Sequence, residues 1–206
     1  MRIIAITQKG MEKDENEDRI VVGKSIISEG SFSAEIKNGI LAIADGVGGN
    51  NAGAVASHFV ATKISVQNEI AVETLKTIND ELIQLSSNVP EYSRMATTLS
   101  GLYVSQDIIK LFSIGNTRVF MLQGGKYLKQ LTNDDTTINY LLATGQLDTQ
   151  GAENFDRKNE ITACFGGGAS DLFRIKFSSL EFVNSPIMIT SDGIHDYLSV
   201  DRIEDI

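Results

Sequence analysis

Apolar residues change their spacing along the chain, and this change predicts where strands and helices lie. Short apolar runs bounded by turn residues predict strands at 3–6, 19–22 and 39–44. Between 52 and 87 the apolar residues recur three or four positions apart, which predicts one long helix or a helix pair that breaks near 67–68. The second helix is expected to end at 88–90, where Pro90 stops it.

The second half of the chain predicts mainly strands. Successive apolar runs predict strands at 98–104, 108–114, 119–123, 127–131, 172–177 and 186–190. The pair Gly124-Gly125 is a strong hairpin signal between two of these strands. Helical patterns occur at 136–143, 194–198 and 200–206, and the polar stretch 145–160 is expected to lie on the surface. This order of elements predicts an α+β fold with a central antiparallel β-sandwich inside and helices outside.

Composition narrows the class of protein. The 206 residues contain no internal repeat and only two prolines, which predicts a single domain. There are 18 Lys and Arg against 27 Asp and Glu, a net charge of −9, which argues against binding to the nucleic acid backbone. The single cysteine, Cys164, favours a reducing compartment. Because the N-terminal apolar run is too short for a signal peptide and no apolar stretch approaches ~20 residues, we expect a cytoplasmic protein without membrane contact.

Acidic residues stand where three predicted strands begin or end. Two buried strands run into Asp45-Gly46 and Asp192-Gly193, and the segment 16–18, which contains Glu17 and Asp18, directly precedes another strand. Asp-Gly is also an ordinary turn dipeptide, and 16–18 alone is consistent with a solvated turn. If the three segments converge, they offer oxygen ligands without a His–Cys set, which suits Mg²⁺ or Mn²⁺ better than zinc. Two such ions can activate a water that attacks phosphorus.

Six segments in order resemble the metal-dependent protein phosphatases of the 2C type, the PPM family, and especially its small bacterial members. These segments are 10–18, 41–49 with 52–57, 96–99, 114–118, 131–135 and 189–193. The resemblance covers almost the whole chain. It implies a β-sandwich flanked by pairs of antiparallel helices, and the hydrolysis of phosphoserine and phosphothreonine in proteins with two Mg²⁺ or Mn²⁺ ions.

The resemblance also implies roles for individual residues. Asp45 would bridge both metals, the Gly46 carbonyl would bind one of them, and Asp192 would bind the other. Glu17 and Asp18 would bind a metal or its waters. Asp45, Asp192 and Asp18 would therefore be the catalytic residues of this chain.

The sequence departs from the family pattern at several positions. Lys13 stands where the family has a phosphate-binding arginine, and lysine supplies charge without a bidentate fork. Asn116 replaces the aspartate of a third metal site, so that site is expected to be weak or absent. Val47 replaces a histidine that could act as a general acid. No Asp-Asn pair follows the last helices, so we expect 1–206 to be a phosphatase domain truncated at its C-terminus, as a fragment or as a shortened member.

Two main functions follow from this pattern. The first is a monomeric protein serine/threonine phosphatase in signal transduction, which acts on a phosphorylated protein and opposes a Ser/Thr kinase. The alternative is a catalytically degenerate domain that binds phosphoproteins or regulates a partner, as the shortened metal site, Lys13 and Asn116 would suit. A hydrolase for a small phosphorylated metabolite is a third possibility.

Overall fold

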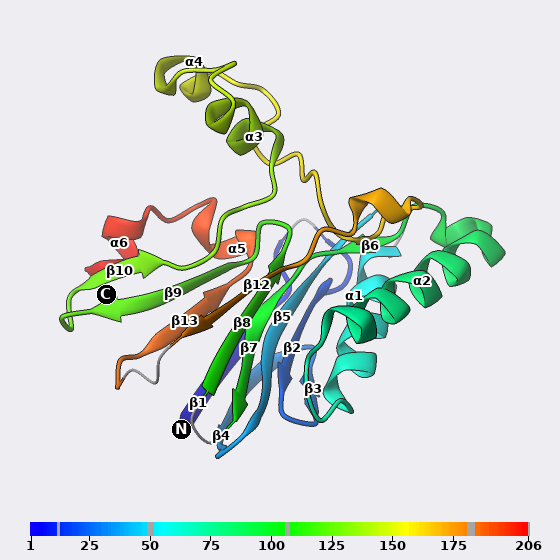
Figure 1. Ribbon diagram of the computed structural model, residues 1–206, viewed down its shortest axis with the longest axis horizontal. Coiled ribbons are helices and arrows are strands. Elements are labelled where there is room, and N and C mark those ends of the chain that lie inside the picture. The colour runs from blue at the N-terminus through cyan, green and yellow to red at the C-terminus, as the bar shows by residue number, and fades with distance from the viewer. Residues whose placement is uncertain (12, 49–51, 106–107, 181–183, 206) are drawn as a thin grey trace.

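The fold is taken from a computed structural model of the chain (Figure 1). It describes residues 1–206 except 12, 49–51, 106–107, 181–183 and 206. Glu12 and Gly49, which belong to the segments that carry the family resemblance, and Ile206, at the end of the last expected helix, therefore lie outside the described residues.

An antiparallel sheet of eight strands forms the main layer of the fold. Its path runs β11-β6-β5-β7-β8-β12, and β2 pairs with β5 and with β3. The strands are β2 (Asp18–Val22), β3 (Ser25–Ile27), β5 (Gly39–Val47), β6 (Ala96–Thr97), β7 (Leu99–Ser105), β8 (Ile108–Ile114), β11 (Phe165–Gly166) and β12 (Lys176–Leu180). β5 pairs with β2, β6 and β7, so its last residues lie among several chain segments.

Two smaller antiparallel sheets form the second layer. One pairs β1 (Arg2–Thr7) with β4 (Gly30–Glu35), and the other has the order β10-β9-β13. The latter strands are β9 (Arg118–Gln123), β10 (Tyr127–Gln130) and β13 (Ile187–Thr190). A hydrophobic cluster joins the two layers: Ala5 of β1 and Val119 of β9 pack with Leu41 of β5 and Leu102 of β7. The layers therefore form the expected antiparallel sandwich.

A helix pair covers the other face of the main sheet. The helices α1 (Ala52–Ser65) and α2 (Val72–Asn88) pack on this sheet beside β5 (Figure 1). Their buried side chains, among them Val60, Ile64, Leu75 and Leu82, share a second core cluster with Phe112 of β8. The predicted pair and its break near 67–68 are confirmed, because 66–71 lies between the helices.

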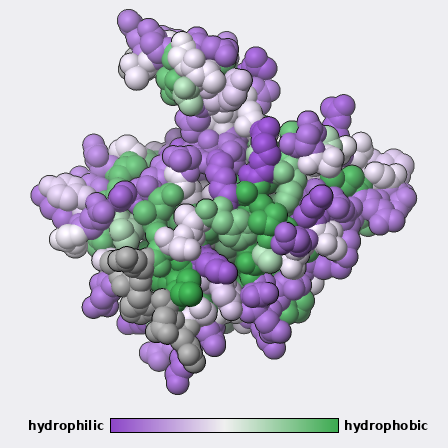
Figure 2. Space-filling view, viewed as in Figure 1, coloured by the Kyte–Doolittle hydropathy of each residue, from purple (hydrophilic) through white to green (hydrophobic). Residues whose placement is uncertain are grey.

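The remaining helices are short. The segment 136–161, which we call the outlying segment, contains α3 (Thr137–Ala143) and α4 (Thr149–Glu153) and stands away from the sandwich (Figure 1). After β13 come α5 (Asp192–His195) and α6 (Val200–Glu204), and single 3-10 turns lie at η1 (Pro90–Tyr92) and η2 (Ser170–Leu172). No helix in the described residues is long and apolar enough to cross a membrane. Apolar side chains gather on the face of the sandwich seen in Figure 2.

Several sequence predictions are corrected by the structure. The strand expected at 172–177 lies at Lys176–Leu180, because Leu172 ends a 3-10 turn and the pairing with β8 begins at Lys176. The helix expected at 194–198 is α5, which begins at Asp192 and ends at His195. The hairpin at Gly124-Gly125 is confirmed, since both residues have φ values, 60° and 70°, that favour glycine.

Candidate metal and phosphate site

Two of the predicted acidic residues lie directly opposite each other in neighbouring strands. The antiparallel register of β2 and β5 pairs Asp18 with Asp45. Directly opposed residues project from the same face of a sheet, so both carboxyl groups leave the sheet side by side. Asp45 is buried, with only 9% of its surface exposed.

Asp192 joins this pair from the second layer of the sandwich. The chain leaves β13 after Thr190, and Asp192 is the first residue of α5. The hydroxyl of Ser191 donates a hydrogen bond of 2.7 Å to Oδ2 of Asp18, which ties the end of β13 to the start of β2. The structure therefore brings together the three acidic segments that the sequence places far apart.

The carboxyl groups of the cluster shift one another's pKa values. Burial, together with the neighbouring charges of Asp18 and Asp192, raises the pKa of Asp45 well above its usual value. Burial also raises the pKa of Asp18, although the hydrogen bond from Ser191 opposes this effect. A proton or a cation relieves the repulsion among such carboxylates, and their oxygen-only chemistry fits a hard divalent cation.

The backbone of Asp45 is held by a pair of threonines. Its N–H donates to the hydroxyl of Thr98 at 3.2 Å, and its carbonyl accepts from the N–H of Thr98 at 2.9 Å. The hydroxyl of Thr97 donates to the same carbonyl at 2.8 Å. All of these atoms are buried, so the hydrogen bonds fix the backbone direction of Asp45.

Gly46 allows α1 to begin close to the acidic cluster. A Cβ atom on Gly46 would lie 2.2 Å from the carbonyl oxygen of Gly53, in the first turn of α1. The N–H of Gly46 donates to the carbonyl of Glu17 at 3.2 Å, and the hydroxyl of Ser57 donates to the same carbonyl at 2.5 Å. Glu17 is therefore anchored through its backbone, even though it precedes the regular strand.

The predicted phosphate-binding lysine is paired with a predicted metal ligand. Nζ of Lys13 lies 2.7 Å from Oε2 of Glu17, with 59% of the Lys13 side chain and 11% of the Glu17 side chain exposed. The hydrogen bond to Glu17 is the main cause that raises the pKa of Lys13, and the charges of Asp45 and Asp192 add to it. The structure thus places a cationic group at the rim of the carboxylate cluster.

The residues that lead from β8 into β9, 115–118, contact three different parts of the structure. The N–H of Gly115 donates to Asp135 at 3.1 Å, and Nδ2 of Asn116 donates to Oδ2 of Asp192 at 3.2 Å. The side chain of Thr117 lies 2.6 Å from the hydroxyl of Thr98. Arg118 donates to a single carboxylate oxygen of Asp134, Oδ2, through Nε at 2.9 Å and through a terminal nitrogen at 2.6 Å, so the ion pair is charge-assisted. This connection therefore links the acidic cluster to Asp134 and Asp135, which directly precede the outlying segment.

The predicted ligands do not form a finished metal cage. Within the described part of the chain, no group of three or more His, Cys, Asp or Glu residues is arranged to hold an ion. Instead, Asp18 accepts from Ser191, Asp192 accepts from Asn116, and Glu17 is paired with Lys13. The carboxylates are of the type that binds a divalent cation. In this structure, however, their oxygen atoms are directed at Ser191, Asn116 and Lys13.

Sequence reasoning missed the residues that orient the cluster. Ser191 and Thr98 hold Asp18 and Asp45, yet their partners are distant in sequence, and only the adjacency of Ser191 to Asp192 is a sequence signal. His195 is buried, with its Nδ1 3.0 Å from the hydroxyl of Thr190. Burial raises the pKa of the Cys164 thiol to about 11, so this thiol is a poor nucleophile.

The structure is an antiparallel sandwich with a helix pair on one face, and carboxylates gather where its strands begin or end. The resemblance to 2C-type protein phosphatases implies this class of structure. Comparisons with known proteins agree with this class. The chain is 26% identical over 216 residues to the serine/threonine phosphatase Stp of Listeria monocytogenes, and the match spans 97% of this chain and 80% of the relative. It is 28% identical over 219 residues to protein phosphatase PhpP of Streptococcus pneumoniae, spanning 100% of this chain and 84% of the relative. No protein-family model matches the chain.

Solved structures show the same fold. The serine/threonine phosphatase Stp1 of Staphylococcus aureus superposes with a TM-score of 0.78 at 24% identity, covering 98% of this chain and 80% of that structure. The catalytic domain of the serine/threonine phosphatase PstP, in complex with two manganese ions, superposes with a TM-score of 0.75 at 23% identity over 99% of this chain and 83% of that structure. The comparisons therefore confirm the resemblance to bacterial 2C-type protein phosphatases.

Proposed function

We propose that the chain is a metal-dependent protein serine/threonine phosphatase that hydrolyses phosphoserine and phosphothreonine. The observation that carries this proposal is the convergence of Asp18, Asp45 and Asp192, which come from two strands and one helix N-terminus in different layers. The named phosphatase relatives, which match almost the whole chain, support a catalytic role over a degenerate binding module.

We expect the residues of the cluster to bind different ligands. Asp45, the Gly46 carbonyl and Asp192 would hold divalent cations, and Glu17 and Asp18 would hold a cation or its waters. When bound, Mg²⁺ or Mn²⁺ supplies positive charge that lowers the pKa of water and neutralises the phosphoryl oxygens. A relative in fold is in complex with two manganese ions, which supports two sites, and the uncharged amide of Asn116 argues against a third.

Lys13 would contribute on the substrate side. Its ammonium group is exposed at the rim of the cluster, where it can contact a phosphoryl oxygen if it releases Glu17. A lysine neutralises charge as a point cation and does not orient a phosphate as a guanidinium does. We expect weaker phosphate binding than a bidentate arginine at this position would provide.

The cellular setting is also part of the proposal. We expect a monomer in the cytoplasm that opposes a Ser/Thr kinase in signal transduction. The single cysteine suits the reducing cytoplasm, and a phosphoprotein substrate implies a kinase that phosphorylates it. The domain 1–206 would act as one unit.

Phosphatase assays with EDTA and with added Mn²⁺ test this function directly. A phosphothreonine peptide, p-nitrophenyl phosphate and a sugar phosphate would be compared as substrates for the wild-type chain. We expect Mn²⁺-dependent hydrolysis that favours the phosphopeptide. Asp45→Asn is expected to be inactive, whereas Asp201→Asn, the same change at an exposed position in α6, is expected to keep full activity.

Two outcomes would contradict the proposal. Absence of Mn²⁺-dependent hydrolysis together with retained phosphopeptide binding would favour the binding module. A preference for the sugar phosphate would favour the metabolite hydrolase.

A further inference from the structure

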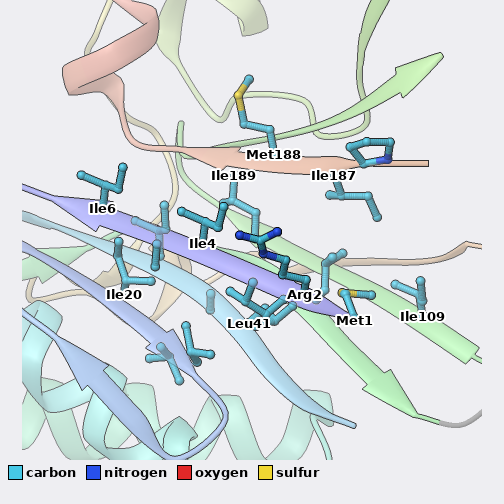
Figure 3. A pocket seen from close by; sticks show the side chains of 18 of the residues that line it. Met1, Arg2, Ile4, Ile6, Ile20, Leu41, Ile109, Ile187, Met188 and Ile189 are labelled. Atoms are coloured by element: carbon cyan, nitrogen blue, oxygen red, sulfur yellow. The ribbon is translucent and has the colours of Figure 1, made fainter. Parts of the chain in front are cut away.

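A pocket on the helix side of the main sheet combines an apolar wall with a cationic group. It has a volume of about 410 Å³ and lies between α1 and the side chains of Glu15 and Arg19. It is distinct from the mainly apolar cavity of the second layer, which lies between β1 and β13 beside Ile4 and Ile189 (Figure 3). We call the helix-side cavity the α1 pocket.

Strand alternation directs Arg19 into the wall of the α1 pocket. Successive side chains of β2 point to opposite faces of the sheet, so Arg19 shares a face with Val21 and not with Asp18. Val21 packs in the core cluster that contains the buried side chains of α1 and α2. Arg19 therefore faces α1, on the opposite side of the sheet from the carboxyl group of Asp18.

The guanidinium of Arg19 has one side bound by the protein and one side free. Nη1 donates to the carbonyl of Asn16 at 2.6 Å and to the carbonyl of Asp18 at 2.8 Å, which holds the group in place. Nε is buried without a hydrogen-bond partner among the described residues, and Nη2 makes no hydrogen bond to them either. Nε and Nη2 form the edge of a guanidinium that matches the two oxygens of a carboxylate. A buried donor without an acceptor is costly, so a ligand that brings an acceptor to this edge gains from it.

The other wall of the pocket is one face of α1. Val55, Phe59 and Thr62 are three or four residues apart, so their side chains line up along the helix. Val55 and Phe59 are half-buried and present an apolar surface, whereas Thr62 is exposed. The pocket therefore offers an apolar surface for a ligand body within reach of a cationic edge.

The charges around the pocket favour a ligand with one negative charge. Lys63 also lines the pocket, but its ammonium is paired with Glu81 at 2.6 Å. His58 and the carboxylate of Glu15 are exposed in the lining. Arg19 is thus the cation that is left for a ligand, and Glu15 together with the net charge of −9 disfavours a polyanion.

A strand of polypeptide has no template in this pocket. β2 is paired on both sides, with β3 and with β5, and the backbone groups within α1 bond to one another. The last helix, α6, packs on β10 of the second layer, where the N–H of Leu128 donates to Glu204 at 2.6 Å. That layer lies on the other side of the main sheet from α1 (Figure 1). These observations favour a small molecule over a strand of this chain or of another protein.

We propose that the α1 pocket binds a small organic anion with one carboxylate and an apolar ring. The carboxylate would accept from Nη2 of Arg19 and, after a small shift of the guanidinium, from Nε, while the ring would lie on Phe59 and Val55. Small-molecule sites are mostly apolar with a few polar groups and have volumes of about 300–1,000 Å³, a range that includes this pocket. The binding does not depend on the proposed phosphatase activity.

Titration calorimetry with naphthalene-2-carboxylate tests the proposal, and naphthalene-2-carboxamide is the neutral control of the same shape. The titrations are made in EDTA, so that the probe cannot bind through a cation held by the acidic cluster. We expect saturable binding of one carboxylate per chain, about tenfold or more tighter than binding of the carboxamide, because only the carboxylate forms charge-assisted hydrogen bonds with Arg19.

Two substitutions locate the binding. Thr62→Trp fills the pocket from the exposed face of α1 and should weaken binding by about tenfold or more. Thr77→Trp, the same change at an exposed position of α2 outside the pocket lining, is the matched control and should bind like the wild type. Arg19→Lys keeps a positive charge but removes the two-nitrogen edge, so it should weaken the carboxylate and leave the carboxamide unchanged.

Nuclear magnetic resonance of the wild-type chain makes the test independent of how these variants fold. The carboxylate should shift the Nε–H resonance of Arg19 and the amide resonances of Val55 and Phe59, and the carboxamide should leave the Arg19 resonance in place.

Four results would overturn the proposal. The first three are the absence of saturable carboxylate binding, equal affinities for carboxylate and carboxamide, and equal binding by Thr62→Trp and Thr77→Trp. The fourth is loss of binding in a form of the chain that continues past residue 206, since this would show that the chain's own continuation fills the pocket.

Discussion

The amide of Asn116 donates a hydrogen bond of 3.2 Å to the carboxylate of Asp192, across 76 positions of sequence. A carboxylate at position 116 would repel Asp192, whereas the amide holds it in place. The residue that departs from the family pattern is therefore a positioning residue for a predicted metal ligand in this chain.

Changing Asn116 tests this relationship. Asn116→Ala removes a hydrogen bond to a charged group, which is expected to lower the free energy of unfolding by about 1.5–3 kcal/mol. Asn116→Asp is expected to lower Tm in EDTA because it adds a charge beside Asp192, and to gain more Tm from Mn²⁺ than the wild type does. Thermal melts in EDTA and across a Mn²⁺ series measure both effects. Equal Mn²⁺ responses of the wild type and Asn116→Asp would show that position 116 does not face the metal site.

The carboxylate of Asp45 is expected to be needed for phosphatase activity and to lower the stability of the metal-free protein. Its buried carboxyl group is surrounded by the charges of Asp18 and Asp192, so Asp45→Asn removes repulsion from the folded protein. We expect a higher Tm than the wild type in EDTA, and a loss of phosphatase activity of at least roughly 100-fold. A lower Tm in EDTA would mean that the carboxylate is stabilised by its surroundings and would contradict the described electrostatics.

Lys13 is expected to affect substrate binding more than folding. Its ion pair with Glu17 is largely exposed on the lysine side, and exposed pairs contribute no more than about 1 kcal/mol to stability. Lys13→Met should therefore raise KM for a phosphopeptide with little change in Tm, and Lys13→Arg should lower KM because a guanidinium can bind phosphate in a bidentate manner. Steady-state kinetics measure both values, and an unchanged KM in Lys13→Met would exclude phosphate binding by this residue.

His195 should make stability depend on pH. Burial, and next the charge of Arg118, lower the pKa of His195 to about 4, below its ordinary value of 6.5. The unfolded chain therefore binds more protons between pH 4 and 6.5, so the stability present above pH 6.5 is lost as the pH falls toward 4. We expect His195→Gln to flatten this part of the Tm profile. His58→Gln, the same substitution at an exposed histidine of α1, is the matched control. Parallel profiles for the wild type and His195→Gln would contradict the pKa shift.

The contact between Gly46 and Gly53 predicts a strong steric effect. A methyl group at position 46 would meet the backbone of α1, so Gly46→Ala should lower Tm and should also disturb the neighbouring Asp45. Gly10→Ala is the matched control, because a Cβ atom at Gly10 meets no atom within 4 Å. Calorimetry of both variants measures the difference, and similar Tm values would show that α1 moves freely away from β5.

Elements with a clear local apolar pattern can be predicted from the sequence. Strands that exist only because they pair with a strand distant in sequence cannot. The helix spacing of α1 and α2 and the apolar run of β5 are local signals, and the structure confirms them. β4 (Gly30–Glu35) has only Phe32 and Ala34 as apolar residues, and β6 and β11 have two residues each, so their strand character comes from partners distant in sequence. Lys176–Leu180 became a strand through the register of β8, which no local pattern reveals.

In the candidate site, too, some features have a local sequence signal and others depend on tertiary contacts. Asp45 and Asp192 are recognisable because each follows a buried apolar run, and Asp18 follows from its acidic segment. Their convergence depends on the register of β2 with β5 and on the hydrogen bond from Ser191, and both are tertiary relationships. The pairing of Lys13 with Glu17 is local in sequence, but a lysine four residues before a glutamate has this meaning only in the folded loop.

The connection between β8 and β9 has consequences for how the chain can vary. The four residues 115–118 make contacts with three separate parts of the fold, which are the segment 134–135, Asp192 and Thr98. A single inserted residue would shift at least two of these contacts out of reach at once. Although surface connections usually tolerate changes in length, natural variants of this chain should therefore conserve the spacing from 115 to 118 and accept insertions in the outlying segment instead.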